Sequence, residues 1–366
     1  MKIKNLILVS FAVVLSSCSA VKNKPTADTK LKFLDEYIFP SQWKLQDTEI
    51  GGLSGIDNYN DGYIIVCDDS KNPRIYTAEI NVENSKIDTV IFKDVIFFSL
   101  EDPFLENTFL DLESILYRPT KQQILVSSEG SINNKRDPSI FNISPSGDFV
   151  NSYEIPSYFY AESEYKPRHN GLFEGLTRSY NDSGFWVGTE LPLVTDGEEP
   201  TTTESYSPVR ITYYNWENET PSDQFIYPLD KIEKAPKEDF AVNGLSDLFA
   251  VGEKKFLVLE RSYSSGWGKE ANGLKIYEVE ATATENTLDT HNLAEKKLKP
   301  VSKKLAFDLE TIRKKLQLQT IDNIEGICYG PTLPNGNKTL ILISDNNFNV
   351  MSPQINQFLL FEIVDF

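Results

Sequence analysis

The chain has 366 residues, of which 40% are apolar and 12% aromatic, so it is long enough to bury a large core. Its formal net charge of −18 gives a surface that repels nucleic acid and anionic lipid, which argues against nucleic acid as a partner. The sequence contains no Gly-x-Ser-x-Gly motif, no P-loop and no dinucleotide fingerprint, and its two histidines are too few for a His-rich zinc site.

The first residues have the pattern of a bacterial lipoprotein signal. Lys2 and Lys4 form a basic region, residues 6–15 form an apolar run too short to span a bilayer, and Leu15-Ser16-Ser17-Cys18 resembles a lipobox. The resemblance implies cleavage before Cys18, a lipid on its sulfur and, because Ser19 is not an inner-membrane retention residue, an outer-membrane protein that faces the periplasm. We therefore expect a signal peptide over residues 1–17, a polar tether over 18–30 and one domain over 31–366. The alternative is an ordinary secretory signal with an incidental cysteine.

A short motif occurs five times in the rest of the chain. Each copy has an apolar residue, then Ser or Glu, then a small or acidic residue, then Ile or Leu. The copies begin at Leu53, Leu112, Phe173, Leu245 and Ile324. A short apolar run follows each copy and ends on a carboxylate, namely Asp69, Glu129, Glu190, Glu260 and Asp345. Turn residues such as Asn60-Asp61-Gly62 lie between motif and run, so each copy predicts two antiparallel strands joined by a turn.

The repeat continues with further apolar segments, which predict the fold class. A third segment follows each time (74–80, 139–143, 208–214, 273–279 and 357–364), and a fourth follows three of the copies (90–98, 149–155 and 224–227). Three or four antiparallel strands repeated in series predict an all-β protein, a β-propeller with five blades by repeat count and six as the alternative. Residues 32–40 read as a strand that closes the ring beside residues 358–364.

Other segments carry weaker signals. Residues 307–318 have the best helical pattern, with Asp308 as a cap and Leu309, Ile312 and Leu316 as an apolar stripe. Residues 282–298 have little apolar pattern and read as a surface excursion. Cys67 and Cys328 lie in predicted strands, and we expect two buried free thiols, with a disulfide between the first and last blades as the alternative.

The carboxylates predict the site. The first strand of each propeller blade lines the central channel, so Glu113, Glu174 and Glu325, at one place in three motifs, are expected to converge and are the catalytic candidates. The carboxylates that end the second strands (Asp69, Glu129, Glu190, Glu260 and Asp345) are expected to gather at one rim and hold a hard cation, with Ca²⁺ as the candidate. Candidates to bind an anionic ligand are Arg168, His169, Arg178, Arg210 and Arg261. The alternative is a structural web of buried Glu–Arg pairs.

Four segments resemble the phytase-like family known as "esterase-like activity of phytase". They are Phe173-Glu174-Gly175-Leu176, Leu112-Glu113-Ser114-Ile115, Ile324-Glu325-Gly326-Ile327 and Gly51-Gly52-Leu53-Ser54-Gly55-Ile56-Asp57. The resemblance covers about residues 31–366 and implies a propeller that hydrolyses a small-molecule ester or phosphoester; Ser246 departs from the pattern, because Glu is expected there. We therefore expect a lipid-anchored, monomeric hydrolase, and the alternative is a non-catalytic propeller that binds ligands or acts as a scaffold at the cell envelope.

The lipobox resemblance predicts that Cys18 carries the membrane anchor. The Cys18→Ala variant should lose the anchor, because no thiol remains to be lipidated, and should leave the membrane fraction. Fractionation of cells that produce the variant and the unaltered protein measures this. If the variant sediments with membranes as the unaltered protein does, the lipoprotein prediction is wrong.

Overall fold

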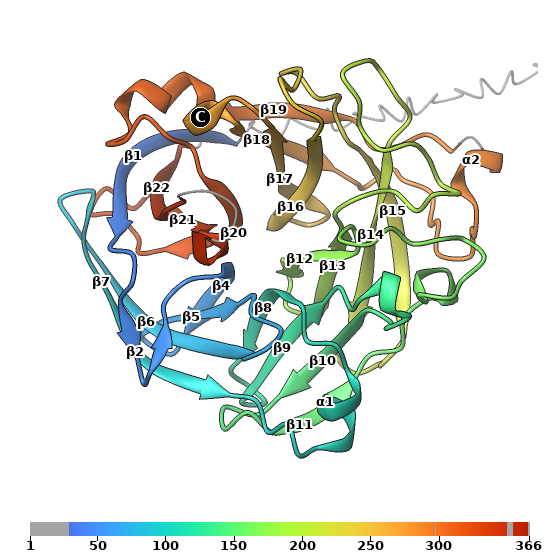
Figure 1. Ribbon diagram of the computed structural model, residues 1–366, viewed down its shortest axis with the longest axis horizontal. Helices are drawn as coiled ribbons and strands as arrows, with labels where there is room; N and C mark the ends of the chain where they lie inside the picture. Colours follow the sequence, from blue (N-terminus) through green and yellow to red (C-terminus); the bar gives the residue numbers. More distant parts are fainter. Residues whose placement is uncertain (1–28, 297, 350–353, 365–366) are drawn as a thin grey trace, which may run out of the picture.

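The computed structural model describes residues 29–296, 298–349 and 354–364, and its main strands form a five-bladed β-propeller (Figure 1). Each blade is a four-stranded antiparallel sheet, and the first strands of neighbouring blades contact one another around the axis. The first two blades contain β4 (Leu53–Tyr59), β5 (Gly62–Cys67), β6 (Arg74–Glu83) and β7 (Lys86–Phe97), then β8 (Leu112–Arg118), β9 (Gln123–Ser128), β10 (Ser139–Ile143) and β11 (Phe149–Ser152). The next two contain β12 (Phe173–Arg178), β13 (Gly184–Thr189), β14 (Pro208–Asn215) and β15 (Pro221–Pro228), then β16 (Ala241–Gly252), β17 (Lys255–Ser264), β18 (Asn272–Glu280) and β19 (Lys303–Asp308).

The fifth blade joins the two ends of the chain. Its inner strands β20 (Asn323–Gly330), β21 (Thr339–Asp345) and β22 (Asn356–Val364) are completed by β1 (Lys30–Phe39), which pairs antiparallel with β22 (Figure 1). This confirms the predicted closing strand and the count of five blades. β1 begins at Lys30, the last residue assigned to the tether, and a short hairpin of β2 (Lys44–Leu45) and β3 (Thr48–Glu49) follows it.

The core consists of five clusters of buried apolar side chains, and each cluster lies between two neighbouring blades. The second strand of every blade is covered on both faces, which explains why these strands read as continuous apolar runs. Cys67 and Cys328 both lie in the cluster between the fifth and first blades and are free thiols, as predicted.

Side-chain hydrogen bonds join the inner strands across every junction between blades. The inner strand is a sheet edge, and its backbone N–H groups need acceptors once they are buried. The acceptors are Asp57 Oδ2 for Tyr117 N (2.8 Å), Ser114 Oγ for Leu176 N (3.1 Å), Thr177 Oγ1 for Ala250 N (3.0 Å) and Asp247 Oδ2 for Ile327 N (2.9 Å). At the last junction Asn58 Nδ2 donates to Tyr329 O at 3.0 Å.

The third residue of the motif is kept small where two inner strands nearly touch. A Cβ atom on Gly55 would lie 2.8 Å from Ser114 Cα, and one on Gly175 would lie 2.8 Å from Asp247 Cα. Both distances are shorter than van der Waals contact, so these positions require glycine for the ring to close.

The predicted helix at residues 307–318 is wrong in type and in its start. Phe307 and Asp308 belong to β19, where they pair with Ile276 and Lys275, and a 3₁₀ helix, η4 (Leu309–Lys315), follows. Asp308 does cap it, accepting a hydrogen bond from Glu310 N at 2.9 Å, and the apolar stripe is buried as predicted. The three-residue spacing of Leu309 and Ile312 also fits a 3₁₀ helix, and Leu316 follows the helix as its C-cap, so the stripe did not distinguish the two.

The surface excursion predicted at residues 282–298 packs back on the third blade. Thr287 N donates to Gln224 O at 2.9 Å, so the segment covers the edge strand β15. It contains α2 (Leu293–Lys296), and the other short helices are α1 (Pro103–Asn107), η1 (Ile132–Asn134), η2 (Ser157–Phe159), η3 (Gly268–Glu270) and η5 (Asn347–Asn349). None of the helices in the described part of the chain is long and apolar enough to cross a membrane.

Asp247 should be one of the residues on which ring closure depends most. Its carboxylate accepts from Leu248 N and Ile327 N, so Asp247→Ala leaves two buried donors unsatisfied and should lower the free energy of unfolding by about 3 kcal/mol. Urea unfolding measures this, with Asp61→Ala as the control because Asp61 is exposed in a turn. Equal effects of the two substitutions would contradict this role for Asp247.

Candidate functional site

A β-bulge interrupts the inner strand of every blade at the motif. The pairing with the second strand shifts directly after the first motif residue, so Ser54, Glu113, Glu174, Ser246 and Glu325 stand outside the regular ladder. Bulges re-aim side chains that would otherwise follow the strict alternation of a strand. Glu174 and Glu325, from the third and fifth blades, thereby come within 4 Å of the same arginine, Arg261.

A second set of side chains stands opposite the entry of each inner strand. Asp68, Glu129 and Glu190 donate their backbone N–H groups to Gly52, Asp111 and Leu172, at 2.8, 3.0 and 2.8 Å. The register places Arg261 opposite Gly244 and Asp345 opposite Asn323 in the remaining blades. Four carboxylates (Asp68, Glu129, Glu190 and Asp345) and Arg261 therefore occupy equivalent positions. We call these four carboxylates, together with Asp111, Glu113, Glu174 and Glu325, the carboxylate cluster.

Asp69 and Glu260 do not join this cluster, so the prediction that they lie at the rim is wrong. In their blades the neighbouring residues, Asp68 and Arg261, occupy that position. Asp69 Oδ2 pairs with Arg74 Nη1 at 2.7 Å. Glu260 is buried beside the third blade, where it accepts from Tyr227 Oη at 2.5 Å and also pairs with Lys303. Neighbouring residues of a strand point to opposite faces, so a shift of one residue removes a side chain from the channel.

Arg261 lies among the carboxylates. Its Nη2 is 3.0 Å from Glu190 Oε1, 3.6 Å from Glu325 Oε1 and 3.8 Å from Glu174 Oε1. Its Nη1 donates to Asn323 Oδ1 at 2.5 Å, while its Nε is buried and has no hydrogen-bond partner within the described residues. This guanidinium therefore holds three carboxylates while its Nε has no partner among the described residues.

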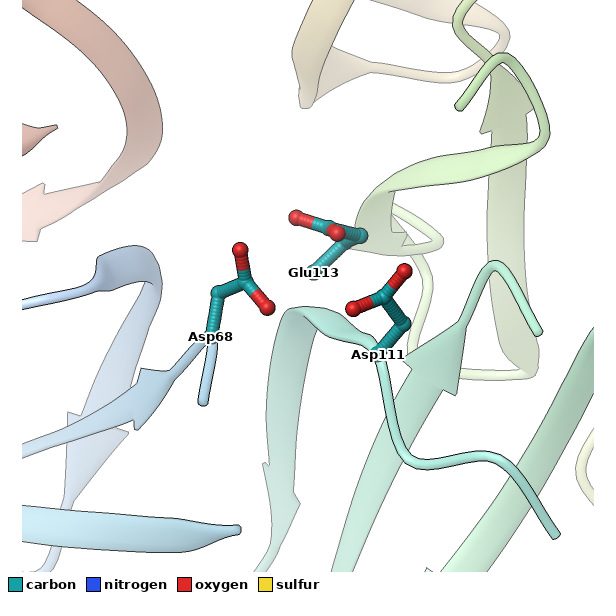
Figure 2. Close-up of side chains that lie close together, drawn as sticks. All are labelled: Asp68, Asp111 and Glu113. Carbon is teal, nitrogen blue, oxygen red and sulfur yellow. The ribbon is translucent and has the colours of Figure 1, made fainter. Parts of the chain in front are cut away.

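The carboxylates also form two groups of three, and of their members only Glu174 lies within 4 Å of Arg261. Asp68, Asp111 and Glu113 point toward one another (Figure 2), and one oxygen from each lies within 4.8 Å of the others. Glu113, Glu129 and Glu174 meet the same criterion, so Glu113 belongs to both groups. Asp68 and Asp111 were not predicted, although Asp111 directly precedes the second motif and Asp68 precedes the residue that was chosen.

Burial and mutual repulsion raise the pKa values of these carboxyl groups. Burial first, and then the charges of Asp68 and Glu174, hold the pKa of Glu113 well above its usual range. Burial raises the pKa of Glu190 to about 7 against the opposing charge of Arg261. Carboxylates packed in this way must share protons or bind a counter-ion at neutral pH. A donor set made only of oxygens fits a hard divalent cation.

The other predicted ligand-binding residues lie apart from Arg261. His169 is exposed near Asp111: burial raises the pKa of the Asp111 carboxyl, and a hydrogen bond with Asp68 and the charge of His169 oppose the rise. Arg168 Nε pairs with Glu199 at 2.8 Å. Arg210 is buried in the third blade with Asp196, at 2.7 Å. Arg178 lies at the opposite end of the inner strands.

Several solved structures resemble this chain at low similarity. A glycosyl hydrolase from Bacteroides ovatus has 9% identity over 84% of this chain and 83% of that chain, with a TM-score of 0.43. An α-L-arabinanase from Cellvibrio cellulosa has 8% identity over 85% of this chain and 91% of that chain, with a TM-score of 0.43. A duf4221-family protein from Bacteroides vulgatus has 10% identity over 93% of this chain and 100% of that chain, with a TM-score of 0.41. Such likenesses concern the fold alone.

Sequence comparison gives a more specific result. No curated protein sequence matches the chain. A family model described as "Phytase-like: Esterase-like activity of phytase" matches residues 48–348 and so spans all five copies of the motif. The chain therefore belongs to the phytase-like family, in agreement with the resemblance of its motifs.

Proposed function

We propose that this phytase-like propeller hydrolyses esters or phosphoesters at the carboxylate cluster, with a bound divalent cation such as Ca²⁺. The observation that carries the proposal is the convergence of two groups of three carboxylates on Glu113, beside the single guanidinium of Arg261. A purely structural Glu–Arg web would pair its charges, whereas here the carboxylates far outnumber the arginine. Such an excess of negative charge is costly without a cation.

The residues that would hold the cation are the two groups of carboxylates. Asp68, Asp111 and Glu113 offer one set of oxygen ligands, and Glu113, Glu129 and Glu174 offer the other. Asp345 lies nearby, and burial, followed by the charges of Glu325 and Asp68, holds the pKa of its carboxyl well above its usual range. A cation at such a site supplies Lewis-acid polarisation of a carbonyl or phosphoryl oxygen.

The remaining steps fall to side chains of the chain itself. Arg261, whose side chain is partly exposed, would orient the substrate by donating from its guanidinium to a carbonyl or phosphoryl oxygen. Glu174 and Glu190 flank this guanidinium, and the pKa of Glu190, about 7, suits proton transfer near neutral pH. One of them would take the proton of the attacking water and return it to the leaving alcohol oxygen. Glu325, the third carboxylate on Arg261, would hold the guanidinium in place.

The location of the protein in the cell is proposed from its sequence. Cys18 lies outside the described residues, and its lipobox resemblance supports attachment to the outer membrane with the propeller in the periplasm. A monomer acting on a small-molecule substrate, held to the membrane by the lipid alone, is the simplest arrangement for such a protein. The net charge of −18 supports a function without nucleic acid.

Stability should depend on pH and on the cation together. The pKa values of the clustered carboxyls lie above their usual values near 4.3, and that of Glu190 reaches about 7. Between these values the folded chain binds more protons than the unfolded chain, so the free energy of unfolding falls as the pH rises. We therefore expect the melting temperature in EDTA to fall between about pH 5 and about pH 8. Millimolar Ca²⁺ should raise it, and more so at the higher pH, because it binds the ionised folded cluster. Melts that are identical with Ca²⁺ and with EDTA would remove the cation from the proposal.

Hydrolysis should depend on Glu174. Mature protein is assayed with p-nitrophenyl esters, p-nitrophenyl phosphate and phytate, in Ca²⁺ and in EDTA. Glu174→Gln keeps the side-chain volume but removes one of the two candidate bases and one oxygen ligand of the cation, and should lower the rate by about a hundredfold or more. Glu154→Gln, at an exposed position, is the matched control. Stabilisation by Ca²⁺ without turnover of any substrate would refute the hydrolase and favour a binding propeller.

A further inference from the structure

A cavity lies at the opposite end of the inner strands from the carboxylate cluster. Its volume is about 580 Å³, within the range of small-molecule sites, and it is lined by residues from all five inner strands. Ile56, Leu176 and Ile327, the fourth residues of their motifs, line it and are each 3% exposed. This apolar floor separates the cavity from the carboxylate cluster, which lies at and before the second motif residues.

The charged groups around this cavity already balance one another. Two acids, Asp57 and Asp182, and two bases, Arg178 and Lys338, line it, so its formal charge is zero in a chain of net charge −18. Arg178 Nη1 pairs with Asp182 Oδ1 at 2.8 Å, and its Nη2 is 3.8 Å from Asp57 Oδ2. A charged ligand would have to break these pairs or bury an extra charge, so the cavity favours a neutral ligand.

Side chains that can form hydrogen bonds with a ligand line the cavity above its apolar floor. Burial raises the pKa of Asp57 to about 6, although Arg178 and the N–H of Tyr117 oppose the rise, so at pH 7 this carboxyl is mostly ionised and accepts hydrogen bonds. Tyr117 is 2% exposed and its hydroxyl has no partner within the described residues. Asn60 and Ser179 add further donors and acceptors to the lining.

Aromatic rings complete the lining. Tyr180 lines the cavity and is 60% exposed, so its ring is accessible to a ligand. Phe249 and Tyr329 meet edge to face on another wall, with their centroids 4.6 Å apart. Such rings offer apolar faces to a ligand that is itself polar at its edges.

We propose that this cavity binds a neutral carbohydrate. A sugar ring presents C–H groups on its faces and hydroxyl groups around its edge, and it carries no charge. Those properties match an apolar floor, exposed aromatic faces, and a charge-balanced set of carboxyl, amide and hydroxyl groups. The site is separate from the carboxylate cluster, so the proposal does not depend on hydrolysis there.

The test is a binding measurement on the full-length mature protein by ligand-observed NMR. The probes are glucose, galactose, mannose, xylose, arabinose and cellobiose, with glucuronate and glucosamine as charged counterparts. Tyr180→Ala removes an exposed ring, and Asp57→Asn keeps an acceptor for Tyr117 N, so both variants should fold. Tyr160→Ala is the matched control, because Tyr160 is 40% exposed and does not line the cavity.

We expect at least one neutral sugar to bind in the millimolar range and the charged counterparts to bind more weakly. Tyr180→Ala and Asp57→Asn should each weaken binding by about tenfold, while Tyr160→Ala should not change it. Binding should be the same in Ca²⁺ and in EDTA. The proposal is overturned if no neutral sugar binds, if the two cavity variants bind as the unaltered protein does, if a charged counterpart binds equally well, or if binding requires Ca²⁺.

Discussion

The inner strand of every blade is a sheet edge, and the whole propeller depends on how its neighbour satisfies that edge. Asp57, Ser114, Thr177 and Asp247 each accept a backbone N–H from the next blade, and Asn58 completes the ring. These short contacts require the strands to approach closely, which leaves room only for a small side chain at Gly55 and Gly175. The primary structural role of the repeated motif is therefore to let the inner strands pack closely enough to close the ring.

Closing the ring also creates the site. The bulge that frees the second motif residue turns Glu113, Glu174 and Glu325 toward one region, and the ends of the second strands add further carboxylates. Burial, and then the neighbouring like charges, raise the pKa values of these carboxyls, so the fold bears an electrostatic cost at neutral pH that Arg261 offsets only in part. Strain of this kind typically marks a functional site.

The two ends of the inner strands differ in chemistry because the strands carry different residues at successive positions. The second motif residues bring an excess of acids to one end, whereas the residues after the fourth position bring balanced charges and aromatic rings to the other. The apolar layer of Ile56, Leu176 and Ile327 lies between them. A single ring of strands can therefore present two unlike sites without a second domain.

The sequence by itself determined the number of blades, most of the strands and the closing strand, because these follow from apolar periodicity and repeat spacing. It also identified Glu113, Glu174 and Glu325 as residues that share one place in the repeat. It did not determine which of Asp68 and Asp69, or of Glu260 and Arg261, faces the channel. Cross-strand register decides that choice, and register is set by pairing and bulges rather than by composition. The convergence on Arg261 was likewise decided by tertiary structure alone, since it joins the third, fourth and fifth blades, whose side chains only ring closure brings together.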